Sequence, residues 1–373
     1  MDERKKRTWA EISLGNLEHN VNSMRAQLPA GCRYLGVVKA NAYGHGAVEV
    51  ARKLEEIGVE NMAVACYDEA KQLRDAGIRA ELLILGPSPA FLARDIARLG
   101  NVFQAVGSLH LAKALEEQLA GTDLTLGVHL KIETGMGRTG FVAINPKEVA
   151  EAAEAMALPH LDVQGIFTHF CVSDEYCDPF TQTQFQRFTD TIETLENTSG
   201  RKFRLRHCTN SGAMVNYPET YLDMVRPGIV QYGLYPAREH GALDLKPVMK
   251  LMTRVAEITD HIPGDTVSYG RTYTCETPRR FAVLPIGYAD GLHRTLSNRL
   301  EVVIHGQKVR QCGRICMDMC MVDITDLPDV QIGDEVEIFG GEQSVDVLAE
   351  AIGTISYELL CAVSPRVPRV YVE

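Results

Sequence analysis

Residues 34–66, YLGVVKANAYGHGAVEVARKLEEIGVENMAVAC, decide the fold. The apolar runs at residues 34–39 and 61–66 are each short enough for a buried strand, and residues 47–57 between them repeat apolar side chains at helical spacing. A buried strand, a helix and a second buried strand in this order predict a βαβ unit with two parallel strands.

The same alternation continues from about residue 12 to about residue 235. We expect eight strands, at residues 34–39, 61–66, 81–85, 102–106, 127–132, 163–168, 203–208 and 222–225. Helical patterns lie between the strands or before the first, among them residues 16–28, 47–57, 68–76 and 179–196. Eight βα units within about 220 residues are typical of a (β/α)8 barrel, and a doubly wound parallel sheet is the alternative.

The sequence pattern changes after about residue 240. Short alternating runs punctuated by glycine follow, at residues 285–288, 301–306, 321–324 and 335–341, and they predict an all-β domain. A polar stretch at residues 238–245 marks the boundary. We therefore predict a barrel over residues 12–240 and a β-domain over residues 241–373. An N-terminal strand within residues 1–11 should belong to the β-domain.

Composition excludes several classes of protein. The 373 residues include 38 Lys and Arg against 49 Asp and Glu, a net charge of −11, which argues against binding to nucleic acid or to an anionic membrane. We find neither a signal peptide nor an apolar run that could span a bilayer. The ten cysteines follow no disulfide spacing, so we expect reduced thiols and a cytoplasmic enzyme. Cys312, Cys316 and Cys320 would share one face of a strand, but without a histidine or a fourth cysteine we expect no metal.

Polar residues follow the ends of the predicted barrel strands, where such barrels carry their active sites. A desolvated lysine at Lys39 would supply a neutral amine for a Schiff base. Arg138 lies in a glycine-rich loop and suits a carboxylate. Ser211, with the backbone amides of Gly228 and Ile229, suits a phosphate. Together these groups fit pyridoxal phosphate and an amino acid.

Arg226 restricts the reaction further. A guanidinium donates hydrogen bonds and does not deprotonate in a protein, so a pyridine nitrogen facing Arg226 would stay unprotonated. Such a ring is a weak electron sink, which disfavours transamination and leaves proton exchange at Cα. Racemisation needs acid–base groups on opposite faces of the substrate. Lys39 is one candidate, and Tyr269 is the other, with His169 as its hydrogen-bond link because a free tyrosine titrates at about 10.

Seven motifs resemble those of the alanine racemases, a pyridoxal-phosphate-dependent family with a barrel and a β-domain. They occur in the family's order at Val38–Gly46, His207–Ser211, Arg226–Gly228, Ser268–Gly270, Pro285–Gly291, Gly313–Asp318 and Thr354–Glu358. The resemblance implies interconversion of L- and D-alanine by two-base proton exchange at Cα of a pyridoxal-phosphate aldimine, to supply D-alanine for peptidoglycan. It also implies a homodimer that shares Lys39 and Arg226 of one subunit with Tyr269 and Met317 of the other.

The resemblance also implies roles for individual residues. Lys39 would carry the cofactor and act on the D-enantiomer, and Tyr269 would act on the L-enantiomer. The other expected cofactor contacts are Tyr43, His169, Ser211, Arg226, Gly228, Ile229 and Tyr357. Arg138 and the backbone amide of Met317 would bind the substrate carboxylate, and Tyr288 and Tyr357 would form a narrow inner gate. In family members the lysine that matches Lys131 can be carbamylated, which would give Arg138 an anionic partner.

Other functions stay open at this stage. A racemase for serine or for a broader set of amino acids is one alternative, since Cys171–Ser173 and Glu133 depart from the usual family residues. A barrel-type pyridoxal-phosphate decarboxylase is another, although Arg226 and Tyr269 argue against it. A noncatalytic pyridoxal-phosphate carrier would explain Lys39 and Ser211 but has no use for the β-domain.

Overall fold

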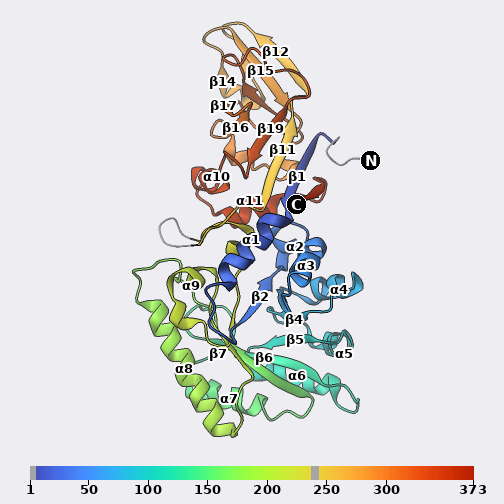
Figure 1. Ribbon diagram of the computed structural model, residues 1–373, viewed down its shortest axis with the longest axis vertical. Coiled ribbons are helices and arrows are strands. Elements are labelled where there is room, and N and C mark those ends of the chain that lie inside the picture. Colours follow the sequence, from blue (N-terminus) through green and yellow to red (C-terminus); the bar gives the residue numbers. More distant parts are fainter. Residues whose placement is uncertain (1–5, 237–242) are drawn as a thin grey trace. The chain divides into compact units, whose positions relative to one another are not determined.

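The computed structural model describes residues 6–236 and 243–373, and its chain divides into two compact units (Figure 1). Within the described residues, one unit comprises residues 18–42 and 47–245. The other comprises residues 6–17, 43–46 and 246–373. The predicted domain boundary at residues 240 and 241 lies outside the described residues.

Eight strands of the first unit follow one another around a parallel sheet. They are β2 (Arg33–Val37), β3 (Asn61–Val64), β4 (Glu81–Ile84), β5 (Val102–Val106), β6 (Leu126–Glu133), β8 (Leu161–Phe167), β9 (Leu205–His207) and β10 (Met224–Val225). Strand β10 pairs with β2, and the amides of Asp223 and Arg226 donate to the carbonyls of Arg206 and Thr209 of the β9 segment at 3.1 and 3.0 Å. The ring of strands therefore closes. The (β/α)8 prediction is confirmed, and the doubly wound alternative is wrong.

Helices alternate with these strands, as the periodicity predicts. They are α1 (Leu14–Arg25), which precedes β2, then α3 (Ala47–Glu56), α4 (Tyr67–Asp75), α5 (Ala93–Arg98), α6 (Leu109–Leu119), α7 (Pro146–Ala155), α8 (Phe180–Ser199) and α9 (Ser211–Asn216). In α3 the buried residues Ala47, Val50, Ala51 and Leu54 recur three and four positions apart, so one face of the helix is apolar. A two-residue strand, β7 (Phe141–Val142), pairs with the end of β6.

The turn after β2 differs from the prediction. The strand ends at Val37 rather than Lys39, and α2 (Lys39–Tyr43) follows with φ between 52° and 54° at its last four residues. Left-handed backbone costs about 1–2 kcal/mol per non-glycine residue. Local hydrogen bonds hold the turn, because the amides of Ala40 and Ala47 donate to the side chains of Glu69 and Asn41 at 2.7 and 2.9 Å.

The second unit is built on a nine-stranded sheet. In spatial order its strands are β12 (Glu257–His261), β15 (Arg279–Leu284), β18 (Cys320–Asp323), β17 (Gln307–Cys312), β16 (Glu301–Ile304), β19 (Glu335–Phe339), β11 (Met249–Arg254), β1 (Thr8–Ser13) and β20 (Arg369–Val372). Strand β1 pairs antiparallel with β11 and parallel with β20. The short pair β13 (Thr266–Val267) and β14 (Tyr273–Thr274) and the helices α10 (Val345–Ala351) and α11 (Ser356–Ala362) complete it.

Two expectations for the second unit are wrong. Residues 285–288 are not a strand, because β15 ends at Leu284 and the 3₁₀ turn η6 (Tyr288–Asp290) follows. The Asp290 carboxylate accepts the Gly287 amide at 2.9 Å and closes this turn. The three cysteines expected on one face of a strand lie instead in β17 (Cys312), in β18 (Cys320) and in the connection between them (Cys316).

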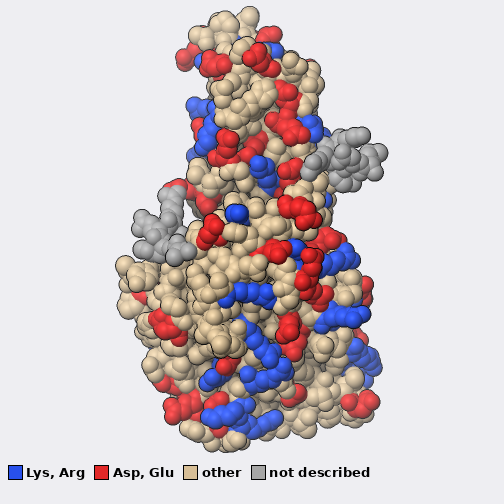
Figure 2. Space-filling view, in the orientation of Figure 1, with Lys and Arg blue, Asp and Glu red and all other residues tan. Residues whose placement is uncertain are grey.

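The surface in view carries both signs of charge. Figure 2 shows acidic and basic side chains intermixed over both units, so this face does not present a field of one sign. Among the described residues, no helix is long and apolar enough to cross a lipid bilayer.

Candidate active site

Basic side chains gather at the carboxyl ends of the barrel strands. Lys39 follows β2, Lys131 lies near the end of β6, and His169 and Arg226 follow β8 and β10. Burial, and then the positive charges of Arg226, Lys131, Arg138 and Lys39, hold the pKa of His169 well below its usual value. Four basic side chains influence one imidazole, so these five predicted residues lie around the same end of the barrel.

Arg226 is the buried centre of this group, with 4 % of its surface exposed. Its guanidinium donates to His207 Nδ1 at 3.0 Å and to the carbonyls of Thr168 and Cys208 at 2.7 and 3.2 Å. The guanidinium also lies over the Phe167 ring, 5.4 Å from its centroid. Burial lowers the pKa of Arg226 to about 10, so the side chain keeps its charge at neutral pH. Neutral acceptors and an aromatic face therefore hold this cation.

A chain of two histidines extends behind Arg226. His207 Nε2 lies 2.8 Å from His129 Nδ1, and both rings are buried. Because a guanidinium only donates, His207 Nδ1 must accept and its Nε2 must carry the hydrogen that His129 Nδ1 accepts. Burial, followed by the charges of Arg204 and Arg226, lowers the pKa of His129 to about 3. Burial, followed by the charge of Arg226, also lowers the pKa of His207. Both imidazoles are therefore neutral, and their tautomers follow from Arg226.

Sequence reasoning missed this histidine chain. The imidazole that the Arg226 guanidinium contacts is His207, which the sequence analysis did not name as a partner of Arg226. His129 precedes Lys131 by two positions in β6, so both side chains lie on the same face of the strand. That spacing was the available signal for His129. The smallness of Gly165 makes room for the ring, because a Cβ there would lie 2.7 Å from His129.

Lys131 is the most deeply buried lysine of the group, with 5 % of its surface exposed. Its Nζ lies 4.9 Å from the centroid of the Phe167 ring. Burial, followed by repulsion from Arg226 and Arg138, lowers the pKa of Lys131 to about 7. A substantial fraction of this lysine is therefore an uncharged, nucleophilic amine at neutral pH.

Arg138 lies in the exposed loop after β6, and Glu133 shapes that loop. The Glu133 carboxylate accepts hydrogen bonds from the amides of Gly135 and Arg138. Burial acts to raise the pKa of Glu133, but bonds from the amides of residues 135–138 outweigh it and lower the pKa. The Glu133 carboxylate thus closes the loop that presents Arg138.

Ser211, Gly228 and Ile229 meet where two helical segments begin. Ser211 starts α9, Ile229 starts the 3₁₀ turn η4 (Ile229–Tyr232), and the Gly228 amide donates to Ser211 Oγ at 2.8 Å. Amides at the start of helical segments favour anions. Ser173 Oγ donates to the side chain of Asn210, the N-cap of α9, at 2.6 Å, so a residue from the unusual 171–173 segment supports Ser211.

The remaining predicted residues belong to the second unit. Tyr43 and Tyr357 face one another with ring centroids 5.8 Å apart, and burial raises the pKa of Tyr43. Tyr269, Tyr288 and Met317 are exposed, with 69 %, 43 % and 53 % of their surfaces accessible. The structure thus divides the predicted site into a barrel group and a β-domain group.

The Tyr269 turn is strained and fastened. Ser268 and Arg271 on either side have φ of 66° and 50°, a region that non-glycine residues rarely occupy. Ser268 Oγ donates to the Arg314 carbonyl at 2.6 Å and lies 3.4 Å from Cys316 Sγ. The segment that carries Tyr269 is therefore tied to the segment that leads to Met317.

Comparison with known proteins covers both units. Residues 12–236 match the family model described as alanine racemase, N-terminal domain, and residues 248–371 match alanine racemase, C-terminal domain. The chain is 44 % identical over 367 residues to the alanine racemase of Desulforamulus reducens, which covers 98 % of each chain.

Solved structures agree with these matches. An alanine racemase of Clostridium difficile superposes with a TM-score of 0.95 at 39 % identity, over 99 % of this chain and 96 % of that chain. The Bacillus anthracis enzyme, solved with bound L-Ala-P, gives a TM-score of 0.92 at 34 % identity, over 99 % of this chain and 95 % of that chain. The chain therefore belongs to the alanine racemase family, a family of isomerases.

Proposed function

We propose that this chain interconverts L-alanine and D-alanine with pyridoxal phosphate as its cofactor. The observation that carries the proposal is Arg226, a buried guanidinium held by His207 and two carbonyls at the end of the barrel where Lys39 and Lys131 also lie. Membership of the alanine racemase family over nearly the whole chain supports the same reaction.

The donors at this end of the barrel fit pyridoxal phosphate. Ser211 and the amides of Gly228 and Ile229 would hold the phosphate, with Tyr43 and Tyr357 as further contacts, and Lys39 would provide the covalent attachment. Arg226 would face the pyridine nitrogen, with His169 nearby. When bound, the cofactor withdraws electrons from the substrate and makes its Cα proton acidic. Because Arg226 only donates, it would leave the pyridine nitrogen unprotonated and limit transamination.

Two groups would move the proton on opposite faces of Cα. The Lys39 amine would serve the D-enantiomer, and the Tyr269 side-chain oxygen would serve the L-enantiomer. Large apolar groups exposed together favour an interface, and Tyr269, Tyr288 and Met317 are all exposed. We therefore propose a homodimer in which Tyr269 and Met317 of one subunit complete the site of Lys39 and Arg226 of the other.

The substrate would be held by its carboxylate. Arg138 supplies a guanidinium on a shaped loop, and the Met317 amide would be the second donor. The uncharged fraction of Lys131 supports its carbamylation, which would place a negative charge beside Arg138. Tyr288 and Tyr357 would form the gate that limits side-chain size, so alanine should lead and serine should follow weakly.

The biological setting follows from the reaction. D-alanine is a building block of peptidoglycan, so we propose a biosynthetic role in the cytoplasm. The Clostridium difficile relative has been solved in complex with cycloserine, a cyclic analogue of alanine, and we expect the same compound to bind here.

The proposal is tested by incubating the purified protein, reconstituted with pyridoxal phosphate, with L-alanine or with D-alanine. We expect each enantiomer to give the racemate, and borohydride reduction followed by peptide mapping to place the cofactor on Lys39. Faster racemisation of serine or lysine than of alanine, or a label on another lysine, would contradict the proposal.

A further inference from the structure

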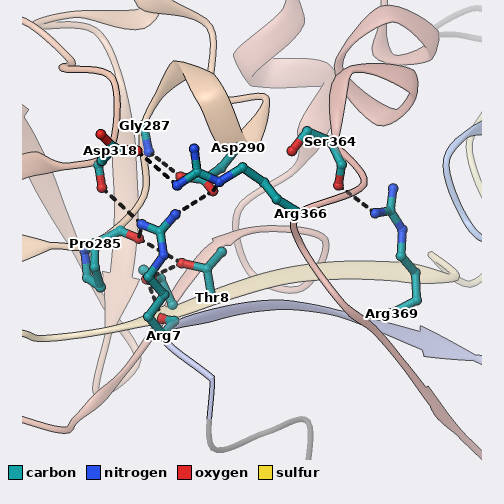
Figure 3. Close-up of polar contacts among 10 residues, drawn as sticks. Arg7, Thr8, Pro285, Gly287, Asp290, Asp318, Ser364, Arg366 and Arg369 are labelled. Carbon is teal, nitrogen blue, oxygen red and sulfur yellow. Dashed lines mark hydrogen bonds and ion pairs between the residues drawn. The ribbon is translucent and has the colours of Figure 1, made fainter.

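The β-domain contains a buried carboxylate between two arginines, and the proposed reaction assigns it no part. Asp290 ends η6, and its side chain is 1 % exposed. Its Oδ1 accepts a hydrogen bond from Arg7 Nη2 at 2.8 Å and forms an ion pair with Arg366 Nε at 3.1 Å, and its Oδ2 accepts the Gly287 amide at 2.9 Å. Figure 3 shows the two guanidinium groups converging on this carboxylate.

The same arginines also fasten the segment that follows Met317. Arg7 donates to the carbonyls of Pro285 and Asp318, and Arg366 Nη2 lies 2.8 Å from Asp318 Oδ1 (Figure 3). Arg7 adjoins strand β1 near the N-terminus, and Arg366 precedes strand β20 near the C-terminus. Both ends of the chain thus reach one cluster, which we define as Arg7, Asp290, Asp318 and Arg366.

Backbone bonds connect this cluster to two residues of the proposed site. The Tyr288 amide donates to the Cys316 carbonyl at 3.1 Å, and the Ala289 amide donates to the Met317 carbonyl at 3.0 Å. The approach is so close that a Cβ on Gly287 would lie 2.4 Å from both of those carbonyl oxygens. The η6 turn and the Met317 segment are therefore bonded to one another through their backbones. Asp290 holds the η6 turn through its bond to the Gly287 amide.

We propose that Asp290, held by Arg7 and Arg366, is a positioning residue that sets the places of Tyr288 and the Met317 backbone. The two arginines of the cluster balance the charges of Asp290 and Asp318. Asp290 therefore holds the turn without giving the exposed surface a net charge. The inference rests on the proposed function, because Tyr288 acts there as the gate and Met317 as a donor to the substrate carboxylate. By positioning Tyr288 and Met317, the ion-pair cluster would influence substrate affinity and size selection without contacting the substrate.

The test compares Asp290→Asn with Asp260→Asn, which removes the same charge from an exposed position of β12 in the same unit. We expect Asp290→Asn to raise KM for alanine about five- to tenfold with a smaller change in kcat. The preference for alanine over serine in kcat/KM should fall about threefold. Asp260→Asn should leave KM and this preference at their wild-type values.

Hydrogen exchange supplies a readout that does not depend on activity. The amides of Gly287, Tyr288 and Ala289 should exchange about tenfold faster in Asp290→Asn than in the wild type. A merely structural role would lower Tm without moving KM, the selectivity or these three amides preferentially. A wild type that binds cofactor but does not racemise alanine would contradict the proposed function, and the exchange result would still decide the role of Asp290.

A second pair of variants covers the case in which Asp290→Asn does not fold. Arg366 is 44 % exposed, so Arg366→Gln removes one partner of Asp290 with less disturbance. It should raise KM and speed exchange at residues 287–289 in the same direction, and Arg366→Lys, which keeps the charge, should recover most of the wild-type KM. Arg366→Gln with wild-type KM, selectivity and exchange would overturn the inference.

Discussion

The barrel and the β-domain hold their candidate residues in opposite ways. In the barrel, Lys131, Arg226 and His207 are removed from water, with 5 %, 4 % and 0 % of their surfaces exposed. In the β-domain, Tyr269 and Met317 are mostly exposed, and the segments that carry them are held by strained turns and ion pairs. One region tunes charge by burial. The other presents its candidate side chains at the surface.

This difference has an electrostatic consequence. The barrel gathers Lys39, Arg138, Arg226 and the partly neutral Lys131 around one end. The buried Arg226 guanidinium has neutral hydrogen-bond acceptors, the His207 ring and a backbone carbonyl. Such a site attracts a phosphate and a carboxylate. On the proposed function, the barrel residues would bind the anionic groups and Tyr269 would supply a proton-transfer group.

The largest expected effect is on Tyr269, the proposed proton-transfer group of the β-domain. Tyr269→Phe should lower racemisation by about a thousandfold or more, because one of the two proton-transfer groups is lost. In D₂O, the α-proton of D-alanine should still exchange, since Lys39 is intact, whereas that of L-alanine should not. Proton NMR of each enantiomer measures this difference.

Tyr273→Phe is the matched control for that experiment. Tyr273 lies in the same unit, and its ring packs edge-on against Phe281 with centroids 5.8 Å apart. It should keep wild-type racemisation and exchange. Equal exchange of both enantiomers in Tyr269→Phe would mean that the second proton-transfer group is another residue.

An intermediate effect is expected at Lys131, in the buried half. Burial, Arg226 and Arg138 lower its pKa to about 7, and only the uncharged amine reacts with CO₂. Raising the pH through about 7 enlarges the uncharged fraction, so activation by added bicarbonate should grow as the pH rises. We expect CO₂-free buffer to raise KM about fivefold at pH 8, equivalent to about 1 kcal/mol.

Lys131→Gln sharpens this prediction, because an amide cannot be carbamylated. The variant should show the same KM with and without bicarbonate at every pH. Bicarbonate activation that persists in Lys131→Gln, or that declines as the pH rises from 6 to 8, would show that another group is responsible.

The smallest effect on activity is expected from the histidine chain, where a substitution should change stability instead. His129→Leu would leave the His207 Nε2–H buried without its acceptor, which should lower the free energy of unfolding by about 1–3 kcal/mol. His129→Asn keeps an acceptor near the position of Nδ1 and should lose less. Urea unfolding of the two variants measures the difference, and equal losses would show that the hydrogen bond contributes little.

Sequence predicted the parts of this molecule that local pattern determines. All eight barrel strands appear near their expected residues because buried parallel strands read as short apolar runs between amphipathic helices. Residues 285–288 were wrongly predicted as a strand, because their apolar pattern competes with the Asp290 carboxylate that closes a turn. The left-handed turn at Ala40–Tyr43 has no propensity signal, since no glycine occupies it.

The site shows the same division between local and distant signals. Strand-end residues such as Lys39, Arg138 and Arg226 could be named because a barrel gathers the ends of all its strands. The bond between His129 and His207 could not, because it joins residues 78 positions apart. The ion pairs of Asp290 with Arg7 and Arg366 depend in the same way on tertiary pairing, here of both chain ends.

The most direct test of a two-part site mixes Lys39→Ala with Tyr269→Ala subunits. Each variant alone should be nearly inactive. If one subunit's barrel works with the partner's Tyr269, random exchange makes half of the dimers mixed, each with one intact site of two, and about a quarter of wild-type activity returns. Activity that stays at the level of the separate variants, with mixed dimers confirmed by mass, would contradict the shared site and show that each subunit uses its own Tyr269 or none.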